Sequence, residues 1–287
     1  MSYKLQKRFL LLGFLFIPLL MLLAFTYYPA VRLVQYSFTD WDGLAKNMNF
    51  VGFDNYKRIF TDSEILAVFS HNIAYLIVAV FQNIAGVFLA VVLNKLGRGS
   101  KIYRSTIFMP YVMNSVAVAY IFAFMYDYNN GAFNHVIRFL GGEGIRFLSD
   151  PFLVNFSLAM IGFWKFTGFA MVIYLGALQA VDNDLYEAAS IDGAGPWNQF
   201  KAITLPAIRR IIELQLFLAI SGSMKAFDEA FAITKGGPNG ASETFVMKTM
   251  ASAFNFSNFG LASAMGIVLM IIILIVTSFK NKLPGEE

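Results

Sequence analysis

Residues 259–279 read FGLASAMGIVLMIIILIVTSF, a run of 21 residues without a charged side chain. About 20 apolar residues in a helix are needed to cross the roughly 30 Å of hydrocarbon in a bilayer. The whole chain shares this character: of its 287 residues, 57% are hydrophobic and 14% are charged, whereas a soluble domain has about a quarter charged residues. The composition therefore predicts a helical protein that crosses a membrane several times.

Five more apolar blocks precede this one and make six expected spans. Strands of an outer-membrane barrel would alternate in polarity over about 10 residues, and these blocks do not alternate. The first block follows basic residues as a secretory signal would, but its length, Pro18 and the lack of a small-residue cleavage site indicate an uncleaved span. We expect a single all-α membrane domain with six transmembrane helices at residues 9–31, 73–93, 106–126, 154–177, 211–233 and 259–279.

The distribution of Lys and Arg predicts the orientation of these spans, because cytoplasmic loops retain basic residues. The two termini with the loops at residues 95–104 and 181–210 hold 12 of the 22 Lys and Arg. The longer opposite loops hold eight, and Lys165 and Lys225 lie inside spans. Both termini and the 181–210 loop are therefore expected to face the cytoplasm.

Several kinds of chemistry lack the residues they need in this sequence. There is no cysteine, which excludes disulfides and thiolate ligands. His71 and His135 have no metal-ligand spacing around them, and no Gly-x-x-x-x-Gly-Lys-Ser/Thr loop for ATP phosphates occurs. The net charge of +4 comes from basic residues beside the spans, which does not indicate nucleic-acid binding. We expect a chain without enzymatic activity, cofactor or metal.

The stretch at residues 181–210 has the signals of a structured loop. Asp184 is expected to cap a helix, with an acidic residue three positions later as in a capping box, and Gly193 ends that helix. Pro196 suits the first turn of a second helix, which Pro206 is expected to close. The apolar faces of this pair need a cover: the chain's own helix ends, a groove on another protein or the lipid surface.

The same loop resembles that of a known family. Glu187-Ala188-Ala189, followed by Gly193 and by Ile203-Thr204-Leu205-Pro206, keeps the residues and spacing of the cytoplasmic EAA loop in permease subunits of binding-protein-dependent ABC importers. Further stretches resemble the carbohydrate-type permeases, which are similar to the maltose and glycerol-phosphate systems, at residues 28–29 (YP), 37–41 (SFTDW), 50–56 (FVGFDNY), 236–238 (GGP) and 242–244 (SET). The resemblance covers nearly the whole chain.

This resemblance implies the fold of a type I ABC importer, in which a pair of coupling helices sits in a cleft of a cytoplasmic ATPase. Ser190 departs from the family, which often has a larger or charged residue there. The carboxylate of Glu187 has two interpretations: an ion pair with a basic residue of the ATPase, or a cap within its own chain. The residues assigned to coupling are Glu187, Ala188, Ala189, Asp192, Gly193 and Pro206.

The resemblance also implies a function and partners. The chain would be the membrane-spanning subunit of an ATP-driven importer of a sugar or oligosaccharide in a prokaryotic inner membrane. Its partners would be a second and different permease, two ATPase subunits that bind ATP and Mg, an extracytoplasmic solute-binding protein and the lipid bilayer. The alternative is an ion-coupled secondary transporter, which usually has midplane carboxylates and inverted repeats; here only the span at residues 211–233 has acids, and no repeat is visible.

Polar residues inside the spans mark a candidate path for the solute, because ionisable groups in a membrane usually face a bundle interior or a water-filled cavity. Lys225 and Asp228 are three positions apart and are expected to share a helix face. The alternative is that these charges snorkel to the surface or pair structurally. Gln82, Asn83 and Asn114 are expected to form interhelical hydrogen bonds. The residues assigned to the path are Trp164, Lys165, Tyr174, Ser221, Lys225 and Asp228.

Overall fold

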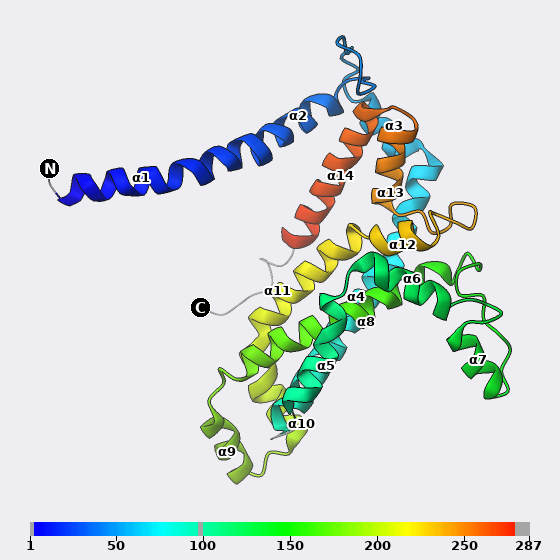
Figure 1. The fold of residues 1–287 in the computed structure, drawn as a ribbon. Coiled ribbons are helices and arrows are strands. Elements are labelled where there is room, and N and C mark those ends of the chain that lie inside the picture. The colour runs from blue at the N-terminus through cyan, green and yellow to red at the C-terminus, as the bar shows by residue number, and fades with distance from the viewer. Residues whose placement is uncertain (1–2, 97–99, 279–287) are drawn as a thin grey trace. The chain divides into compact units, whose positions relative to one another are not determined.

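The computed structural model describes residues 3–96 and 100–278, which are helical almost throughout (Figure 1). Within those ranges, β pairing is limited to an isolated bridge between Thr39 and Phe50. The prediction of an all-α fold is confirmed. The chain forms two compact units, Met1–Ser63 with Thr249–Ile272 and Glu64–Lys248 with Ile273–Glu287.

The helices of the first unit begin with a long apolar rod. Pro29 lies in the first turn of its last segment, and the π-helical turn before it accommodates a residue that has no N–H to donate. The large apolar side chains from Leu10 to Leu23 on this rod are exposed, as lipid contact requires. The elements are α1 (Tyr3–Leu22), η1 (Leu23–Tyr27), α2 (Tyr28–Ser37), α3 (Asp54–Thr61), η3 (Ala251–Asn255) and α14 (Phe259–Ser278).

Close backbone contacts hold the start of α14 to the segment that follows α2. The amide of Gly260 donates to Trp41 O at 3.0 Å, and a Cβ at this position would lie 2.0 Å from Thr39 O. Asn55 Nδ2 on α3 donates to Ser37 O at 3.0 Å and to Thr39 O at 2.8 Å. Position 260 therefore requires glycine, because any side chain would separate these two backbones.

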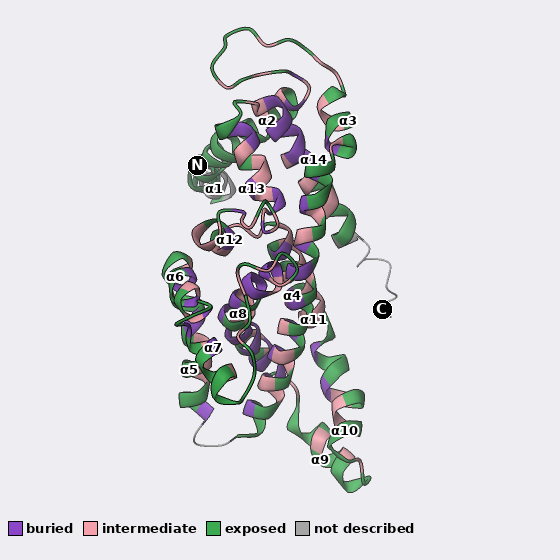
Figure 2. Cartoon of the chain, turned by 90° about the vertical axis from the view of Figure 1, so that its right-hand side faces the viewer, coloured by how far each residue is buried: buried purple, intermediate pink, exposed green. Residues whose placement is uncertain are grey.

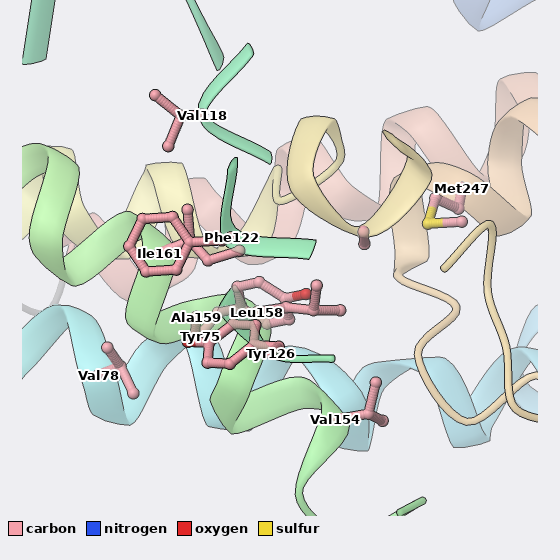
Figure 3. Packing of buried hydrophobic residues seen from close by; sticks show 11 residues of the cluster. Tyr75, Val78, Val118, Phe122, Tyr126, Val154, Leu158, Ala159, Ile161 and Met247 are labelled. Atoms are coloured by element: carbon pink, nitrogen blue, oxygen red, sulfur yellow. The ribbon is translucent and has the colours of Figure 1, made fainter. Parts of the chain in front are cut away.

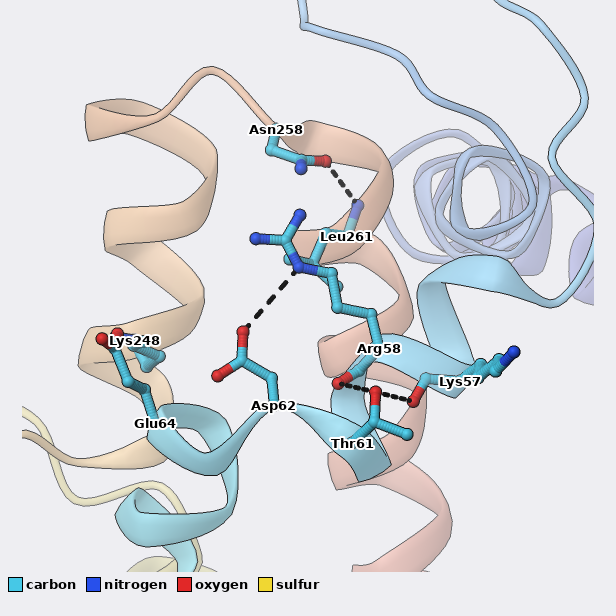
Figure 4. Close-up of polar contacts among 8 residues, drawn as sticks. All are labelled: Lys57, Arg58, Thr61, Asp62, Glu64, Lys248, Asn258 and Leu261. Carbon is cyan, nitrogen blue, oxygen red and sulfur yellow. Dashed lines mark hydrogen bonds and ion pairs between the residues drawn. The ribbon is translucent and has the colours of Figure 1, made fainter.

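Short side-chain contacts stabilise the helix ends of this unit (Figure 4). Asn258 Oδ1 accepts a hydrogen bond from Leu261 N at 3.0 Å and so caps α14. Arg58 Nε lies 3.8 Å from Asp62 Oδ2, one turn later on the chain. Both contacts are local in sequence, so these ends are determined by their own residues.

The second unit contains the remaining helices, and α8 passes through its centre (Figures 1 and 2). Close packing is tightest between α5 and α8, where a Cβ at Gly168 would lie 1.9 Å from Ile107 O. The elements are α4 (Ser63–Lys95), α5 (Ser100–Val112), α6 (Ser115–Met125), α7 (Ala132–Phe139), α8 (Val154–Leu178), α9 (Asn183–Ile191), α10 (Pro196–Gln199), η2 (Phe200–Thr204), α11 (Leu205–Met224), α12 (Asp228–Ile233) and α13 (Phe245–Met250).

Two apolar clusters form the core of this unit. The first joins α4, α6, α8, α12 and α13 around Tyr75, Phe122, Leu158, Ile161 and Met247 (Figure 3). The second joins α4, α8 and α11 through Leu93, Met171, Tyr174, Leu175 and Ile208, among others. Because α8 contributes to both clusters, it carries more buried side chains than the helices around it.

An ion-pair cluster ties α13 to the start of α4. Lys248 Nζ donates to Glu64 Oε2 at 2.8 Å, and Figure 4 shows these two side chains. The same Nζ lies 3.5 Å from Glu243 Oε2. Partial burial of Lys248 disfavours its charge, but the hydrogen bond that it donates to Glu64 and the attraction of Glu243 outweigh this effect and raise the pKa of the ammonium group. The charged form of Lys248 is therefore favoured in the folded protein.

Four helices in the described part of the chain are long and apolar enough to cross a membrane: Leu10–Ser37, Ser63–Lys95, Val154–Leu178 and Phe259–Val276. They coincide with four of the expected spans, and the first three continue past the expected ends at residues 31, 93 and 177. A fifth crossing exists if α5 and α6, which are bent by 98° at a short break, form one span. Six spans stay a prediction. The topology count uses Arg98, Lys280 and Lys282, and the last span ends at Phe279; these positions lie outside the described residues.

The expected continuous helix at residues 211–233 is wrong. α11 ends at Met224, Lys225 and Phe227 have non-helical backbone angles, and α12 begins at Asp228. α11 also carries three charged residues, Arg209, Arg210 and Glu213, so it is not among the four helices that are long and apolar enough to cross a membrane. The segment is thus a helix followed by a corner, and its polar residues do not share one helix face.

Candidate functional site

The first candidate site is the helix pair in residues 181–210. α9 is capped by Asp182, whose Oδ1 accepts from Asp184 N at 3.0 Å. The expected cap at Asp184 is therefore wrong by two positions, because Asp182 precedes the helix and Asp184 lies in its first turn. Glu187 is then two positions too far along the helix to complete a capping box, which needs its acidic residue at position 185. Its side chain is exposed, which leaves the carboxylate available to a partner.

The end of α9 follows the sequence signal closely. Gly193 has a φ of +80°, and Asp192 is the last residue before it. The amide of Ala194 donates to Ala189 O at 2.8 Å and that of Gly193 to Ser190 O at 3.1 Å, which is the hydrogen-bond pattern of a Schellman motif. A left-handed residue is needed at this point, and glycine adopts that conformation without strain.

Side chains make the two short helices of the pair a fixed unit. Gln199 Nε2 donates to Ser190 Oγ at 2.9 Å and to Ala194 O at 3.1 Å. Tyr186 and Thr204 share a hydrogen bond of 3.0 Å between their hydroxyl groups. Ser190, the position that departs from the family, therefore has a role inside the loop: its hydroxyl accepts a hydrogen bond from the side-chain amide of Gln199 on the second helix.

Pro206 does not end the second helix, as the sequence predicted. α10 passes into the π-helical turn η2 and then into α11, with Pro206 in the first turn of α11. The wider π turn η2 accommodates Pro206, which has no backbone N–H. The π turn η1 does the same before Pro29 of α2. The helix pair in residues 181–210 is therefore joined by continuous helix to α11, which lines the second candidate site.

Exposed apolar side chains cover the outer surface of this pair. Ile191 is 87% exposed and Trp197 67% exposed, and the Trp197 ring stacks on Phe200 with a centroid distance of 5.6 Å. Leu185, Glu187, Ala188, Asp192 and Gly193 are exposed as well. A rigid helix pair with bare apolar residues and a free carboxylate has the properties of a docking surface.

The second candidate site is a cavity of about 360 Å³ within the second unit, lined by α4, α5, α6, α8, α11, α12 and the corner between the last two. Much of its wall is aromatic: Tyr111 stacks on Phe169 at 4.5 Å, and Phe163 and Phe166 lie beside them. Its polar lining consists of Tyr75, Gln82, Ser115, Gln215, Ser223, Lys225, Asp228 and Glu229. An apolar wall with a few convergent polar groups is typical of a small-molecule site.

The structure places the six predicted path residues in different surroundings. Lys225 and Asp228 line the cavity, brought there by the corner and not by a shared helix face; no ion pair joins them in the described ranges. Trp164, Lys165, Tyr174 and Ser221 are not among the lining residues.

Three of these four have a local explanation. Lys165 is buried and donates to Ser115 Oγ, so it lies behind the cavity wall. The Trp164 ring is partly exposed and packs on Phe122. Tyr174 belongs to the second apolar cluster, where its hydroxyl donates to Asn83 Oδ1 at 2.7 Å.

Ser221 Oγ is buried and finds no hydrogen-bond partner within residues 3–96 and 100–278. Asn83 forms the predicted interhelical hydrogen bond. Asn114 instead caps α6, where its side chain accepts from Val116 N and Ala117 N.

The most informative cavity residues are ones that the sequence did not single out. Tyr75 Oη and Gln215 Nε2 are buried and have no hydrogen-bond partner among the described residues, and both side chains line the cavity. Gln82 also lines it, although the sequence suggested an interhelical bond. The sequence signal that could have identified these residues is an uncharged amide or phenol inside an apolar block, because burying such a group in a membrane costs free energy unless a hydrogen-bond partner satisfies it.

No group of three or more His, Cys, Asp or Glu side chains in the described part of the chain could hold a metal ion. The cavity offers one ammonium and two carboxylates beside aromatic rings, amides and hydroxyls. This arrangement suits hydrogen bonding to a polar, uncharged molecule.

The comparisons with known proteins give one consistent result. Residues 82–283 match the family described as "Binding-protein-dependent transport system inner membrane component". The multiple sugar-binding transport system permease protein MsmF of Streptococcus mutans is 31% identical over 95% of this chain and 94% of its own length. The trehalose/maltose transport system permease protein MalF of Thermococcus litoralis is 30% identical over 96% and 95%.

A solved structure shows the fold. A chain of a bacterial ABC transporter involved in the import of the acidic polysaccharide alginate superposes with a TM-score of 0.85 at 21% identity, covering 97% of this chain and 96% of that one. The expected type I importer fold is confirmed. The family match gives no support to the alternative of an ion-coupled secondary transporter. The chain belongs to the family of binding-protein-dependent transport system inner membrane components and is a multi-pass permease subunit of an ABC importer, not an enzyme.

Proposed function

We propose that this chain translocates a sugar or oligosaccharide through the cavity lined by Tyr75, Gln82, Gln215, Lys225 and Asp228. The observation that carries the proposal is a pair of buried groups, Tyr75 Oη and Gln215 Nε2, whose side chains line this cavity and which have no hydrogen-bond partner in the described part of the chain. Sugar hydroxyls both donate and accept hydrogen bonds, and their rings stack on aromatic faces. The sugar-transport names of the relatives support this substrate class.

The energy for transport would come from partners. In our proposal two ATPase subunits bind ATP and Mg, and α9 and α10 dock into a cleft of one of them through Ile191, Trp197 and Glu187. ATP binding would draw the coupling pairs of two permease chains together. Because α10 continues through η2 into α11, this displacement would reach the cavity along one helical rod.

The remaining assembly follows from the same proposal. A second, different permease would complete the membrane unit, and an extracytoplasmic solute-binding protein would deliver the sugar. The chain would cross the inner membrane six times, with both termini and residues 181–210 in the cytoplasm. Differential affinity of the binding protein for one conformation would favour outward opening.

The experiment is gentle detergent extraction of the tagged chain, mass spectrometry of the proteins that co-purify, and uptake of labelled trehalose and maltose into proteoliposomes with and without ATP. Recovery of an ATPase and ATP-dependent uptake are expected. Stable recovery of this chain alone, with transport in the absence of ATP, would contradict the proposal.

The docking role of Glu187 is tested in the same preparation with Glu187→Lys and with Asp184→Lys as the matched control. We expect Glu187→Lys to reduce co-purification of the ATPase and leave membrane insertion unchanged. Equal losses in both variants would show that net charge, and not the Glu187 position, determines the association.

A further inference from the structure

The corner between α11 and α12 interrupts a sequence that has no local reason to break. Residues 223–229 read SMKAFDE, without glycine or proline, and all are compatible with a helix. In an unbroken helix the carbonyls of Ser223, Met224 and Ala226 would accept hydrogen bonds from amides four positions later. In the structure, Lys225 has φ −101° and ψ 14° and Phe227 has φ −149° and ψ −54°, which excludes that pattern.

Two side chains from other elements donate to carbonyls of the corner, and one of these carbonyls, Ser223 O, also accepts from Ala226 N at 3.4 Å. Asn72 Nδ2 on α4 donates to Ser223 O at 2.9 Å and to Met224 O at 3.4 Å. Thr244 Oγ1, just before α13, donates to Ala226 O at 2.7 Å. Asn72 is 1% exposed and Thr244 is fully buried. Because buried carbonyls require hydrogen-bond partners, these two side chains stabilise the broken conformation in the interior.

Asn72 also contacts the chain next to Thr244, at the start of α13. Asn72 Oδ1 accepts from Phe245 N at 3.1 Å. His71, the neighbour of Asn72, contacts Glu243 O through Nδ1 at 2.8 Å. Adjacent residues of α4 therefore hold both the corner and the end of the 234–244 segment, which the topology places on the outer side. A displacement of that segment would act on the same contacts that maintain the corner.

We propose that Asn72 and Thr244 are positioning residues that keep α11 and α12 apart and thereby direct Lys225, Asp228 and Glu229 to the cavity. Without their hydrogen bonds, the local helix preference of residues 223–229 would favour continuation of α11, with backbone amides replacing the side-chain donors. The corner would then be the element through which the 234–244 segment acts on the cavity. The role of the cavity in sugar passage rests on the proposed function, whereas the maintenance of the corner does not.

The absence of cysteine from the chain allows a direct test. Lys225→Cys introduces a single thiol at the corner, and its rate of modification by a cationic methanethiosulfonate is measured in the full complex in proteoliposomes. Phe139→Cys, on the exposed surface of α7, is the reference thiol. The rates are compared in three backgrounds: Thr244→Val, which removes the hydroxyl at nearly constant shape, Thr244→Ser, which retains it, and Asn72→Ala.

We expect Thr244→Val and Asn72→Ala to change the modification rate at position 225 about tenfold, the factor that corresponds to one lost buried hydrogen bond. Thr244→Ser should restore the rate to within about twofold of the parent protein, and the rate at position 139 should not change. Unchanged rates at position 225 in both Thr244→Val and Asn72→Ala would overturn the proposal, as would equal changes at position 139, which would indicate general unfolding.

Transport separates this proposal from the proposed function. A changed modification rate at position 225 together with unaltered KM and maximal rate of maltose uptake would support the role of Asn72 and Thr244 and contradict a sugar path through the cavity. If Thr244→Val does not insert in the membrane, Asn72→Ala and the Thr244→Ser rescue decide the outcome by the same readout.

Discussion

The helix pair at residues 181–210, for which we propose a coupling role, and the corner at residues 224–228 are neighbours in the chain and are determined in different ways. The loop has local signals for nearly every feature, such as Asp182 at the helix start, Gly193 at its end and Pro196 at the next start. The corner has none, and distant side chains maintain it. A surface that must keep one shape to dock can rely on local signals, whereas a cavity wall is formed by the packing around it.

The largest expected effect tests the local side of this contrast. Gly193→Val places a β-branched residue at φ +80°, a strain of about 1–3 kcal/mol. Since no atom lies within 4 Å of a Cβ there, the cost is conformational and not a clash. We expect ATP hydrolysis coupled to transport to fall about tenfold or more, measured in the reconstituted complex.

Gly193→Asn is the matched control, because asparagine tolerates the left-handed region better than most residues. It should retain most of the coupled hydrolysis. If asparagine and valine were equally damaging, the backbone conformation at this position would not be the reason for glycine.

The next prediction compares a cavity residue with a buried one. Lys225→Ala should change the KM of sugar uptake and leave assembly and thermal stability intact, because its side chain is exposed to the cavity. Tyr174→Phe removes a hydroxyl that donates to Asn83 and should lower stability by about 1 kcal/mol with unchanged KM. Uptake kinetics and thermal melts of both variants check this, and unchanged uptake by Lys225→Ala would remove it from the path.

A smaller effect sharpens the assignment of the helix cap. Asp182→Ala removes the side chain that caps α9 and should destabilise this helix by about 1 kcal/mol. Asp184→Ala should have little effect, since Asp184 contributes only its backbone amide to the cap. Hydrogen exchange of the α9 amides measures both. Faster exchange in Asp184→Ala than in Asp182→Ala would return the cap to the position that the sequence suggested.

The smallest expected effect concerns pH. The pKa of Lys248 is raised in the folded protein by Glu64 and Glu243 against the effect of burial. A raised pKa means that the stabilisation is fully present below the unfolded value of about 10.4 and is lost as the pH rises through the folded value. The contribution should stay below about 1 kcal/mol, as for partly exposed ion pairs.

Thermal melts between pH 8 and pH 11 should therefore show a steeper loss of stability in the wild type than in Lys248→Met. Parallel curves for the two proteins would indicate that the ion pairs of Lys248 contribute nothing measurable to this unit.

Much of the fold could be predicted because hydrophobic length and helix signals are properties of short segments. The blocks at residues 73–93 and 154–177 lie within α4 and α8, and the EAA spacing identified the family. The predicted cap at Asp184 failed because three acidic or amide residues compete there, and the residue nearest the helix start prevailed. Pro206 did not end its helix because a π turn accommodates proline, a choice that residue type alone does not specify.

The path residues could be predicted only in part. Lys225 and Asp228 line the cavity, but the reason given for them, a shared helix face, is wrong. Lys165 and Tyr174 are buried among neighbours that satisfy them, since a polar side chain in a span can be paired with the protein as readily as with a solute. Gln82 and Gln215 were not assigned to the path because an amide in an apolar block gives the same signal in either case.

By itself the sequence determined that this chain is a helical membrane protein and where most of its helices lie. It also determined where the helix pair at residues 181–210 begins and where its turn at Gly193 falls. These features depend on the free energies of short stretches in lipid or at helix ends. Only the tertiary structure decided which polar groups meet at the cavity. That outcome depends on hydrogen bonds between residues more than 150 positions apart, such as Asn72 and Ser223, which outweigh the local preference of residues 223–229 to remain helical.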